Sequence, residues 1–174
     1  FSMIYHIDTQ GKVHDEYLAK TVIHSDRRFT YEEAQEVIEL GKGDHAEAIT
    51  LLQGIASIWR EERFQKGAIN FEASEVQFVL DPDGKPLDII PKVQREANWL
   101  IEEFMLRANT SVARALDVYT KKKSIPAGIY RDHDVPDMAK LEQFRDSALK
   151  LGGHKLKKID KLEQASQILN EFLG

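Results

Sequence analysis

Polar and apolar residues alternate along several short stretches of the chain, and this period-two pattern predicts β-strands. Residues 2–8 and 19–25 follow it and predict a first pair of strands, joined through a glycine-containing turn. Residues 75–80 and 87–93 predict a second pair, because the segment between them is rich in Asp, Pro and Gly, which favour tight turns. We therefore expect two short antiparallel hairpins.

Longer stretches repeat apolar residues every three or four positions, which is the period of an amphipathic helix. Thr30 and Glu33 form a capping-box pattern that predicts a helix start, and Gly41 is placed to end the same helix. The predicted fold class is α+β, mainly helical with short antiparallel strands, in one unit without a dividing linker. Helices are expected over residues 31–40, 44–64, 95–124, 136–151 and 162–174, and a short strand over residues 128–131.

The long helix that opens at Arg95 carries two adjacent carboxylates among apolar residues. At about 100° per residue, Glu103 falls between two apolar stripes and Glu102 falls close to the second stripe. Burying a carboxylate without a partner is costly, so we expect at least one of the two to have a specific role. The first stripe consists of Ala97, Ile101, Phe104, Ala108, Val112, Ala115 and Tyr119, and the second of Trp99, Leu106 and Ala113.

The composition is that of an ordinary globular chain, with 174 residues of which 42% are hydrophobic and 30% charged. No apolar run reaches the ~18 residues of a membrane span, so we expect no membrane partner. The absence of cysteine excludes disulfides and is compatible with a cytoplasmic location. A net charge of −5 gives no overall attraction to nucleic acid, so RNA or DNA binding would need a local site. The first residue, Phe1, and a final helix that runs into Gly174 are typical of a piece of a longer protein.

Four sequence blocks stand out for their order along the chain. They are Arg28-Phe29-Thr30-Tyr31-Glu32-Glu33-Ala34-Gln35, Gly67-Ala68-Ile69-Asn70-Phe71-Glu72, Leu100-Ile101-Glu102-Glu103-Phe104-Met105-Leu106-Arg107-Ala108-Asn109 and Tyr130-Arg131-Asp132-His133-Asp134-Val135-Pro136. With the hairpin between the second and third blocks, this order resembles the RNB catalytic domain of processive 3′-to-5′ exoribonucleases, the ribonuclease II and ribonuclease R family. The resemblance covers nearly the whole chain, and the sequence of the third block is more similar to the ribonuclease R branch.

The resemblance implies hydrolysis of single-stranded RNA to 5′-nucleotides by a longer parent protein that uses Mg2+. The aspartate cluster that holds the metal in this family lies N-terminal to the matched part, and an arginine-containing block lies C-terminal to it. Residues 1–174 would then be the central fragment of one RNB domain, without a catalytic residue or a metal ligand of its own. We expect the isolated fragment to be inactive, and its partners to be RNA and the remaining segments of the catalytic domain.

Three residues are expected to bind RNA by this resemblance. Tyr31 would lie near the scissile nucleotide, Phe71 would stack on a base, and Glu103 would contact the terminal ribose. Each has a structural alternative, since Tyr31 and Phe71 could simply pack against the core, and Glu103 precedes Arg107 by the four residues of an intrahelical ion pair. Glu102 remains a competitor for the ribose contact, because only the family spacing favours Glu103.

Other polar clusters are weaker candidates. The carboxylates and histidine around Pro136 could suggest a metal site but are more typical of a helix start. Two short lysine runs are the best local places for phosphate contact. These groups are Asp132, His133, Asp134 and Asp137, Lys121 to Lys123, and Lys155, Lys157 and Lys158.

A second class of function is compatible with the same residues. A non-catalytic RNA-binding or assembly module could retain the RNB framework after losing its metal ligands, because a fold does not fix a function. A helical interaction domain unrelated to RNA would require the match of all four blocks to be chance. The sequence N-terminal to Phe1 in the parent would separate the first two readings.

Overall fold

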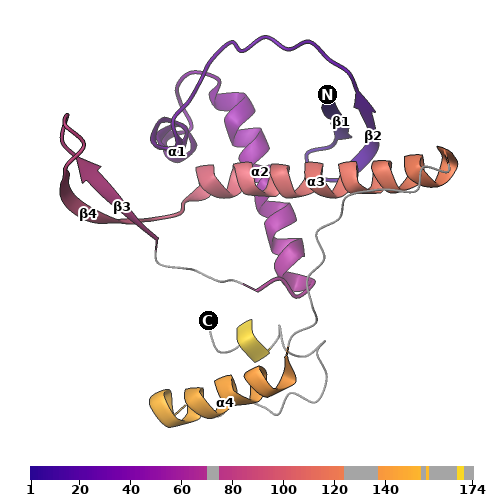
Figure 1. Cartoon of the computed structure of the whole chain (residues 1–174). Helices are drawn as coiled ribbons and strands as arrows, with labels where there is room; N and C mark the ends of the chain where they lie inside the picture. The colour runs from indigo at the N-terminus through magenta and orange to yellow at the C-terminus, as the bar shows by residue number, and fades with distance from the viewer. Residues whose placement is uncertain (70–74, 124–136, 154–155, 157–167, 171–174) are drawn as a thin grey trace. The chain divides into compact units, whose positions relative to one another are not determined.

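The computed structural model describes residues 1–69, 75–123, 137–153, 156 and 168–170 (Figure 1). Contacts divide the chain into two compact units, each of which is described by itself. Unit 1 comprises Phe1–Glu61 and Ser74–Ile129, and unit 2 comprises Glu62–Ala73 and Tyr130–Gly174. The predicted α+β class, mainly helical with short antiparallel strands, is confirmed. No helix in the described part of the chain is long and apolar enough to cross a membrane.

The first strand pair consists of β1 (Ser2–Ile7) and β2 (Val13–Ala19), which are antiparallel. The prediction of a strand over residues 19–25 is wrong, because the chain turns back earlier than its hydrophobic pattern indicates. The Asp8 carboxylate accepts hydrogen bonds from the backbone N–H groups of Gln10 and Lys12, at 2.9 and 3.0 Å, and so closes a tight turn. Pairing therefore starts at Val13, and residues 20–30 have no regular secondary structure.

Helix α1 (Tyr31–Leu40) has the ends that the sequence predicts. The Thr30 hydroxyl accepts from the backbone N–H of Glu33, and the Glu33 carboxylate accepts from the backbone N–H of Thr30. Gly41 ends the helix with φ of 62°, a left-handed conformation that glycine adopts without strain. The capping box and the glycine stop are both confirmed.

Helices α2 (Ala46–Gln65) and α3 (Glu96–Lys123) are the two longest elements. Helix α2 begins two residues after Asp44, so the expected start at Asp44 is wrong by two residues. The reason is His45, whose φ of 54° lies outside the helical range. Asp44 instead pairs with Arg27, whose Nε lies 3.4 Å from Asp44 Oδ2.

The core of unit 1 lies where α2 meets α3 and the first turn. The ring of Trp59 on α2 packs at 4.9 Å, centroid to centroid, against Phe104 on α3. The indole N–H of Trp59 donates to the carbonyl oxygen of Gly11 at 2.7 Å. One buried aromatic side chain therefore fixes both a helix and the β1–β2 turn to α2.

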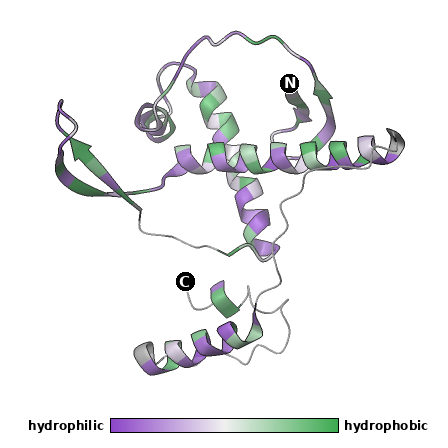
Figure 2. Cartoon of the chain, in the orientation of Figure 1, coloured by the Kyte–Doolittle hydropathy of each residue, from purple (hydrophilic) through white to green (hydrophobic). Residues whose placement is uncertain are grey.

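The predicted second hairpin is confirmed as β3 (Glu75–Leu80) and β4 (Pro86–Lys92), which pair antiparallel. Asp81 organises its turn by accepting from the backbone N–H groups of Asp83 and Lys85. Alternation places apolar residues on one face of the hairpin, and their green colour marks the strands in Figure 2. That face remains exposed at Val76, Phe78, Leu80, Leu87 and Ile89, each 54% to 68% accessible.

Unit 2 is built around helix α4 (Met138–Gly152). Asp137 is its N-cap and accepts from the backbone N–H of Ala139 at 2.9 Å, which agrees with the helix-start reading of that residue. Gly153 ends the helix with φ of 67°. Ile168, only 5% exposed, packs with Met138, Leu141 and Leu156.

Several predictions fall outside the described residues. They concern Phe71, the strand over residues 128–131, most of the helix over residues 162–174, the group Asp132, His133 and Asp134, and the lysine run Lys155, Lys157 and Lys158.

Candidate functional site

The orientation of α3 about its own axis is set by polar contacts as much as by apolar ones. Glu103 is 4% exposed and Ser111 is 2% exposed, and the Ser111 hydroxyl donates to Glu16 of β2 at 2.8 Å. Ile101 and Tyr119 of the first predicted stripe are 42% and 53% exposed. The buried face is therefore turned toward Glu103 and Ser111, because partners from other elements bury these polar residues.

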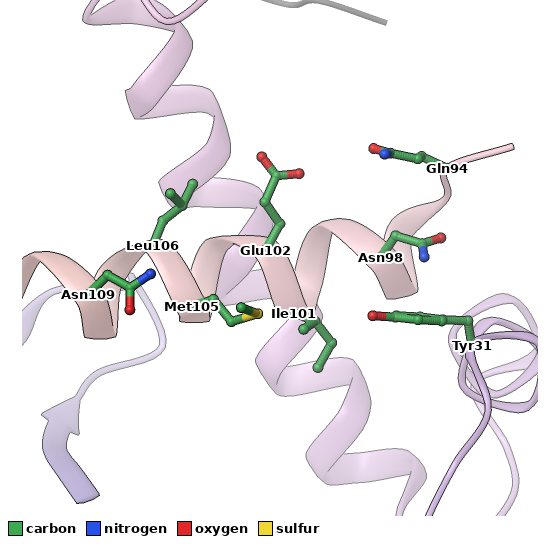
Figure 3. A pocket seen from close by; sticks show the side chains of 8 residues that line it. All are labelled: Tyr31, Gln94, Asn98, Ile101, Glu102, Met105, Leu106 and Asn109. Carbon is green, nitrogen blue, oxygen red and sulfur yellow. The ribbon is translucent and has the colours of Figure 1, made fainter. Parts of the chain in front are cut away.

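A pocket of about 360 Å³ lies along the first half of α3, on a side of the helix that does not carry Glu103. Its volume lies in the range of small-molecule sites. In Figure 3 the ring of Tyr31 extends from α1 toward α3, with its hydroxyl directed at the side that carries Ile101 and Met105. The lining residues are Tyr31, Gln94, Asn98, Ile101, Glu102, Met105, Leu106 and Asn109.

The pocket combines one aromatic ring, one carboxylate and three side-chain amides with an apolar base. Tyr31 is 49% exposed, so a flat ligand can reach its ring. Glu102 keeps 40% of its side chain exposed, and its carboxylate, of which Oε2 lies 4.0 Å from Arg60 Nη1, can accept hydrogen bonds from hydroxyl groups. Stacking on an aromatic ring and hydrogen bonding to ribose hydroxyls are the means by which proteins recognise unpaired RNA.

Glu103 faces away from this pocket into the contact between α2 and α3. Its Oε1 lies 3.9 Å from Nη1 of Arg60, and the Arg60 guanidinium stacks over the ring of Trp99 at 4.5 Å. Glu102 Oε2 lies 4.0 Å from the same Nη1 atom, so Arg60 is near both carboxylates. The Glu103 side chain is 4% exposed, so the alternative that it belongs to a surface ion pair with Arg107 is wrong about its surface position.

The sequence-predicted site residues thus have different positions. Tyr31 lies in the pocket with Glu102, whereas Glu103 is not among the residues that line it. Phe71 lies outside the described residues. Sequence reasoning missed the amides Gln94, Asn98 and Asn109. The eleven-residue spacing of Asn98 and Asn109 follows one side of a helix and could have indicated these two, whereas Gln94 precedes the first residue of α3.

A magnesium site does not fit the described residues, because no group of three or more His, Asp or Glu side chains in that part of the chain could hold a metal ion. Asp137 is engaged as a helix cap. Lys121, one of the predicted phosphate-contact residues, pairs with Asp117 at 2.7 Å.

The family model of the RNB domain matches residues 1–174, so this chain belongs to the RNB domain family. The chain is 30% identical over 170 residues to DIS3-like exonuclease 2 of Arabidopsis thaliana, and 30% identical over 169 residues to a protein of that plant named inactive exonuclease DIS3L2. Each alignment covers 87% of this chain and 16% of the relative, so the chain spans about a sixth of the length of these relatives.

The fold is similar to that of a solved bacterial enzyme. Mycoplasma genitalium RNase R, determined in complex with ribose methylated single-stranded RNA, superimposes with a TM-score of 0.79 at 24% identity. The superposition covers 96% of this chain and 26% of that one.

Proposed function

Because this chain belongs to the RNB domain family, we propose that it is the central part of a processive 3′-to-5′ exoribonuclease that hydrolyses single-stranded RNA to 5′-nucleotides. The catalytic Mg2+ would be held by parts of the catalytic domain outside this chain. The chain itself would contribute the wall of the RNA channel and the residues that position the 3′-terminal nucleotide. A cytoplasmic location belongs to the same proposal and is compatible with the absence of cysteine.

The observation that carries the proposal is that Tyr31 and Glu102 both line one pocket. Only the last nucleotide of an RNA chain has free 2′ and 3′ hydroxyls on one ribose. A carboxylate with two acceptor oxygens can bind both hydroxyls, while the ring of Tyr31 stacks on a neighbouring base. This pairing would hold the 3′ end in place for hydrolysis of the adjacent phosphodiester.

The choice between the two carboxylates follows from exposure. Glu103 was the residue expected to contact ribose, and it remains a candidate in the intact enzyme. Glu102 is favoured here because it lines the pocket and is 40% exposed, whereas Glu103 is 4% exposed beside Arg60. Glu103 would then support the pocket from behind, by holding α3 to α2.

Paired variants of the full-length protein test this assignment. Glu102→Gln and Glu103→Gln are each assayed on a single-stranded RNA that ends in a 2′,3′-diol and on the same RNA with a 3′-deoxy end. The wild-type enzyme should degrade the deoxy-ended RNA about tenfold more slowly in the first step, and Glu102→Gln should abolish this difference. Loss of the difference in Glu103→Gln alone would restore Glu103 as the contact, and a difference unchanged in both variants would refute the ribose contact.

The aromatic contacts are tested in the same assay. Stacking is worth about 1–3 kcal/mol per base, so Tyr31→Ala should lower kcat/KM for RNA by roughly tenfold or more, whereas Tyr31→Phe should keep most of it. Phe71→Ala tests the second predicted stacking residue in the same way. Equal activities for Tyr31→Ala and the wild type would show that Tyr31 only packs.

A non-catalytic RNA-binding or assembly module is the second candidate function, because a relative with equal similarity to this chain is named inactive. The Arabidopsis relative named inactive matches this chain with the same identity and coverage as the relative named an exonuclease. Similarity over the matched region therefore does not distinguish an active exonuclease from an inactive relative. Full-length protein that binds single-stranded RNA without shortening it, with Mg2+ present, would support the second candidate.

A further inference from the structure

Gln35 is a buried polar side chain of α1 to which the proposed function assigns no role. It is 4% exposed, although glutamine is usually found at the surface. Both N–H bonds of its amide are used, since Nε2 donates to Glu39 Oε1 at 2.9 Å and to Glu96 Oε2 at 2.8 Å. Its Oε1 accepts from the backbone N–H of Ala97 at 3.1 Å.

These contacts join α1 to the first turn of α3. Ala97 is the second residue of α3, so its backbone N–H has no acceptor within the helix and Gln35 supplies one. The Glu96 carboxylate lies in the same turn. Its pKa is held below the ordinary value by its own backbone N–H first and by the Gln35 amide second, so the acceptor is charged at neutral pH.

The same junction determines where Tyr31 lies. Tyr31 and Gln35 are four residues apart on α1 and therefore project from the same side of that helix. The α3 residues that line the pocket opposite Tyr31 begin with Asn98, one residue after the Ala97 backbone that Gln35 binds. A small rotation of α1 at Gln35 would move the Tyr31 ring relative to Asn98 and Glu102.

From this geometry we propose that Gln35 is a positioning residue for RNA degradation, which acts by fixing the Tyr31 ring in the pocket. The proposal rests on the proposed function. Gln35 makes no contact with RNA in this scheme. Its effect on the reaction passes entirely through Tyr31.

A double-mutant cycle in the full-length protein tests the proposal. Gln35→Met keeps the length of the side chain and removes its three hydrogen bonds. It should lower kcat/KM for single-stranded RNA about tenfold in the wild-type background and less than twofold in the Tyr31→Ala background, because coupled residues are not additive. Equal losses in the two backgrounds would overturn the positioning role and leave a purely structural one.

Two further variants separate positioning from stability. Val37→Ala removes an apolar side chain of α1 that is 8% exposed, and should lower the melting temperature while changing kcat/KM less than twofold. Glu96→Ala removes the α3 acceptor without altering α1, and replaces Gln35→Met in the cycle if that variant does not fold. It should lower kcat/KM in the wild-type background more than in the Tyr31→Ala background. A loss of activity in Val37→Ala as large as that in Gln35→Met would contradict the proposal.

The same assays separate a failure of the proposed role of the pocket from a failure of the proposed role of Gln35. If Tyr31→Ala degrades RNA at the wild-type rate, the proposed role of the pocket fails and the role of Gln35 fails with it. If Tyr31→Ala is impaired and the Gln35 effect is additive to it, only the role of Gln35 is refuted.

Discussion

Glu102 and Glu103 are neighbours in the chain with different surroundings, and this difference is the basis of the different roles that we propose for them. Glu102 borders a pocket and is 40% exposed, whereas Glu103 is 4% exposed beside the Arg60 guanidinium. A ligand can reach the exposed part of Glu102, whose Oε2 lies 4.0 Å from Arg60 Nη1. A carboxylate enclosed with a cation mainly holds two helices together.

Glu103→Ala should therefore destabilise the chain more than Glu102→Ala. Glu103→Ala removes a buried carboxylate from the α2–α3 contact, although Glu102 Oε2 still lies 4.0 Å from Arg60 Nη1, and the expected loss is about 2 kcal/mol in the free energy of unfolding. Glu102→Ala, at a half-exposed position, should lose less than about 1 kcal/mol. Urea unfolding of both variants measures the difference, and equal losses would contradict the assignment.

The site could be predicted from the sequence only in part, for reasons that differ between residues. Tyr31 is the first residue of the helix that the Thr30–Glu33 capping box starts, and its expected role comes from the family resemblance. The helical period showed that a carboxylate near position 103 would be buried, which is confirmed, but it could not show which neighbour faces a ligand. Gln35 could not be found, since its partner Glu96 is 61 residues away and nothing local marks a glutamine as buried.

At the scale of elements, α1 is held by charged groups at its start. The Glu33 carboxylate accepts from the Thr30 backbone N–H, the main cause that lowers the pKa of Glu33, and the Arg27 guanidinium is the second cause. The pKa of Glu96, at the junction with α3, is also lowered. Both groups therefore act on α1 in their ionised forms.

The sign of the pH dependence follows from these pKa directions. A carboxyl group with a lowered folded-state pKa contributes stability that is complete above its unfolded value, 4.5 for both Glu33 and Glu96, and is lost as pH falls through the folded value. Hydrogen-exchange protection of the α1 amides should thus decrease between pH 5 and pH 3, with intrinsic rates corrected for pH. Amides in the middle of α2 serve as the control, and α1 protection that stays constant relative to them would refute the prediction.

The β1–β2 turn offers a separate test of how Trp59 joins elements. A Cβ added at Gly11 would lie 3.1 Å from the indole nitrogen of Trp59, and Gly11 has φ of 75°. Gly41 has φ of 62° with nothing within 4 Å of such a Cβ. Gly41→Ala should thus lose about 1 kcal/mol from backbone strain alone, and Gly11→Ala should lose about 1 kcal/mol more. Equal losses in thermal unfolding would show that the contact with Trp59 adjusts without cost.

Element boundaries were predictable where a capping side chain or a glycine with positive φ marks them. Thr30, Glu33 and Gly41 fix α1, and Asp81 and Gly84 fix the turn of the second hairpin. The first hairpin shows the opposite case. Residues 19–25 alternate like a strand, but the Asp8 carboxylate closes a tight turn. As a result, residues 13–19 are the ones that pair with β1.

At the scale of the whole molecule, one family model spans two compact units. The proposed activity needs a metal site that the described residues do not supply. The 174-residue chain on its own should therefore not shorten a 5′-labelled single-stranded RNA, even with Mg2+ in excess. Denaturing gel electrophoresis tests this, and degradation that persists through extensive purification would show that the active site is misplaced.

Both tryptophans of the chain, Trp59 and Trp99, lie in the contact between α2 and α3, each beneath an arginine guanidinium. The intrinsic fluorescence of the protein is therefore a report on this one junction. Circular dichroism records every helix, including α4 of unit 2. Unfolding curves from the two signals that coincide would mean that the units melt together, and curves that separate would give the junction its own transition, without any added label.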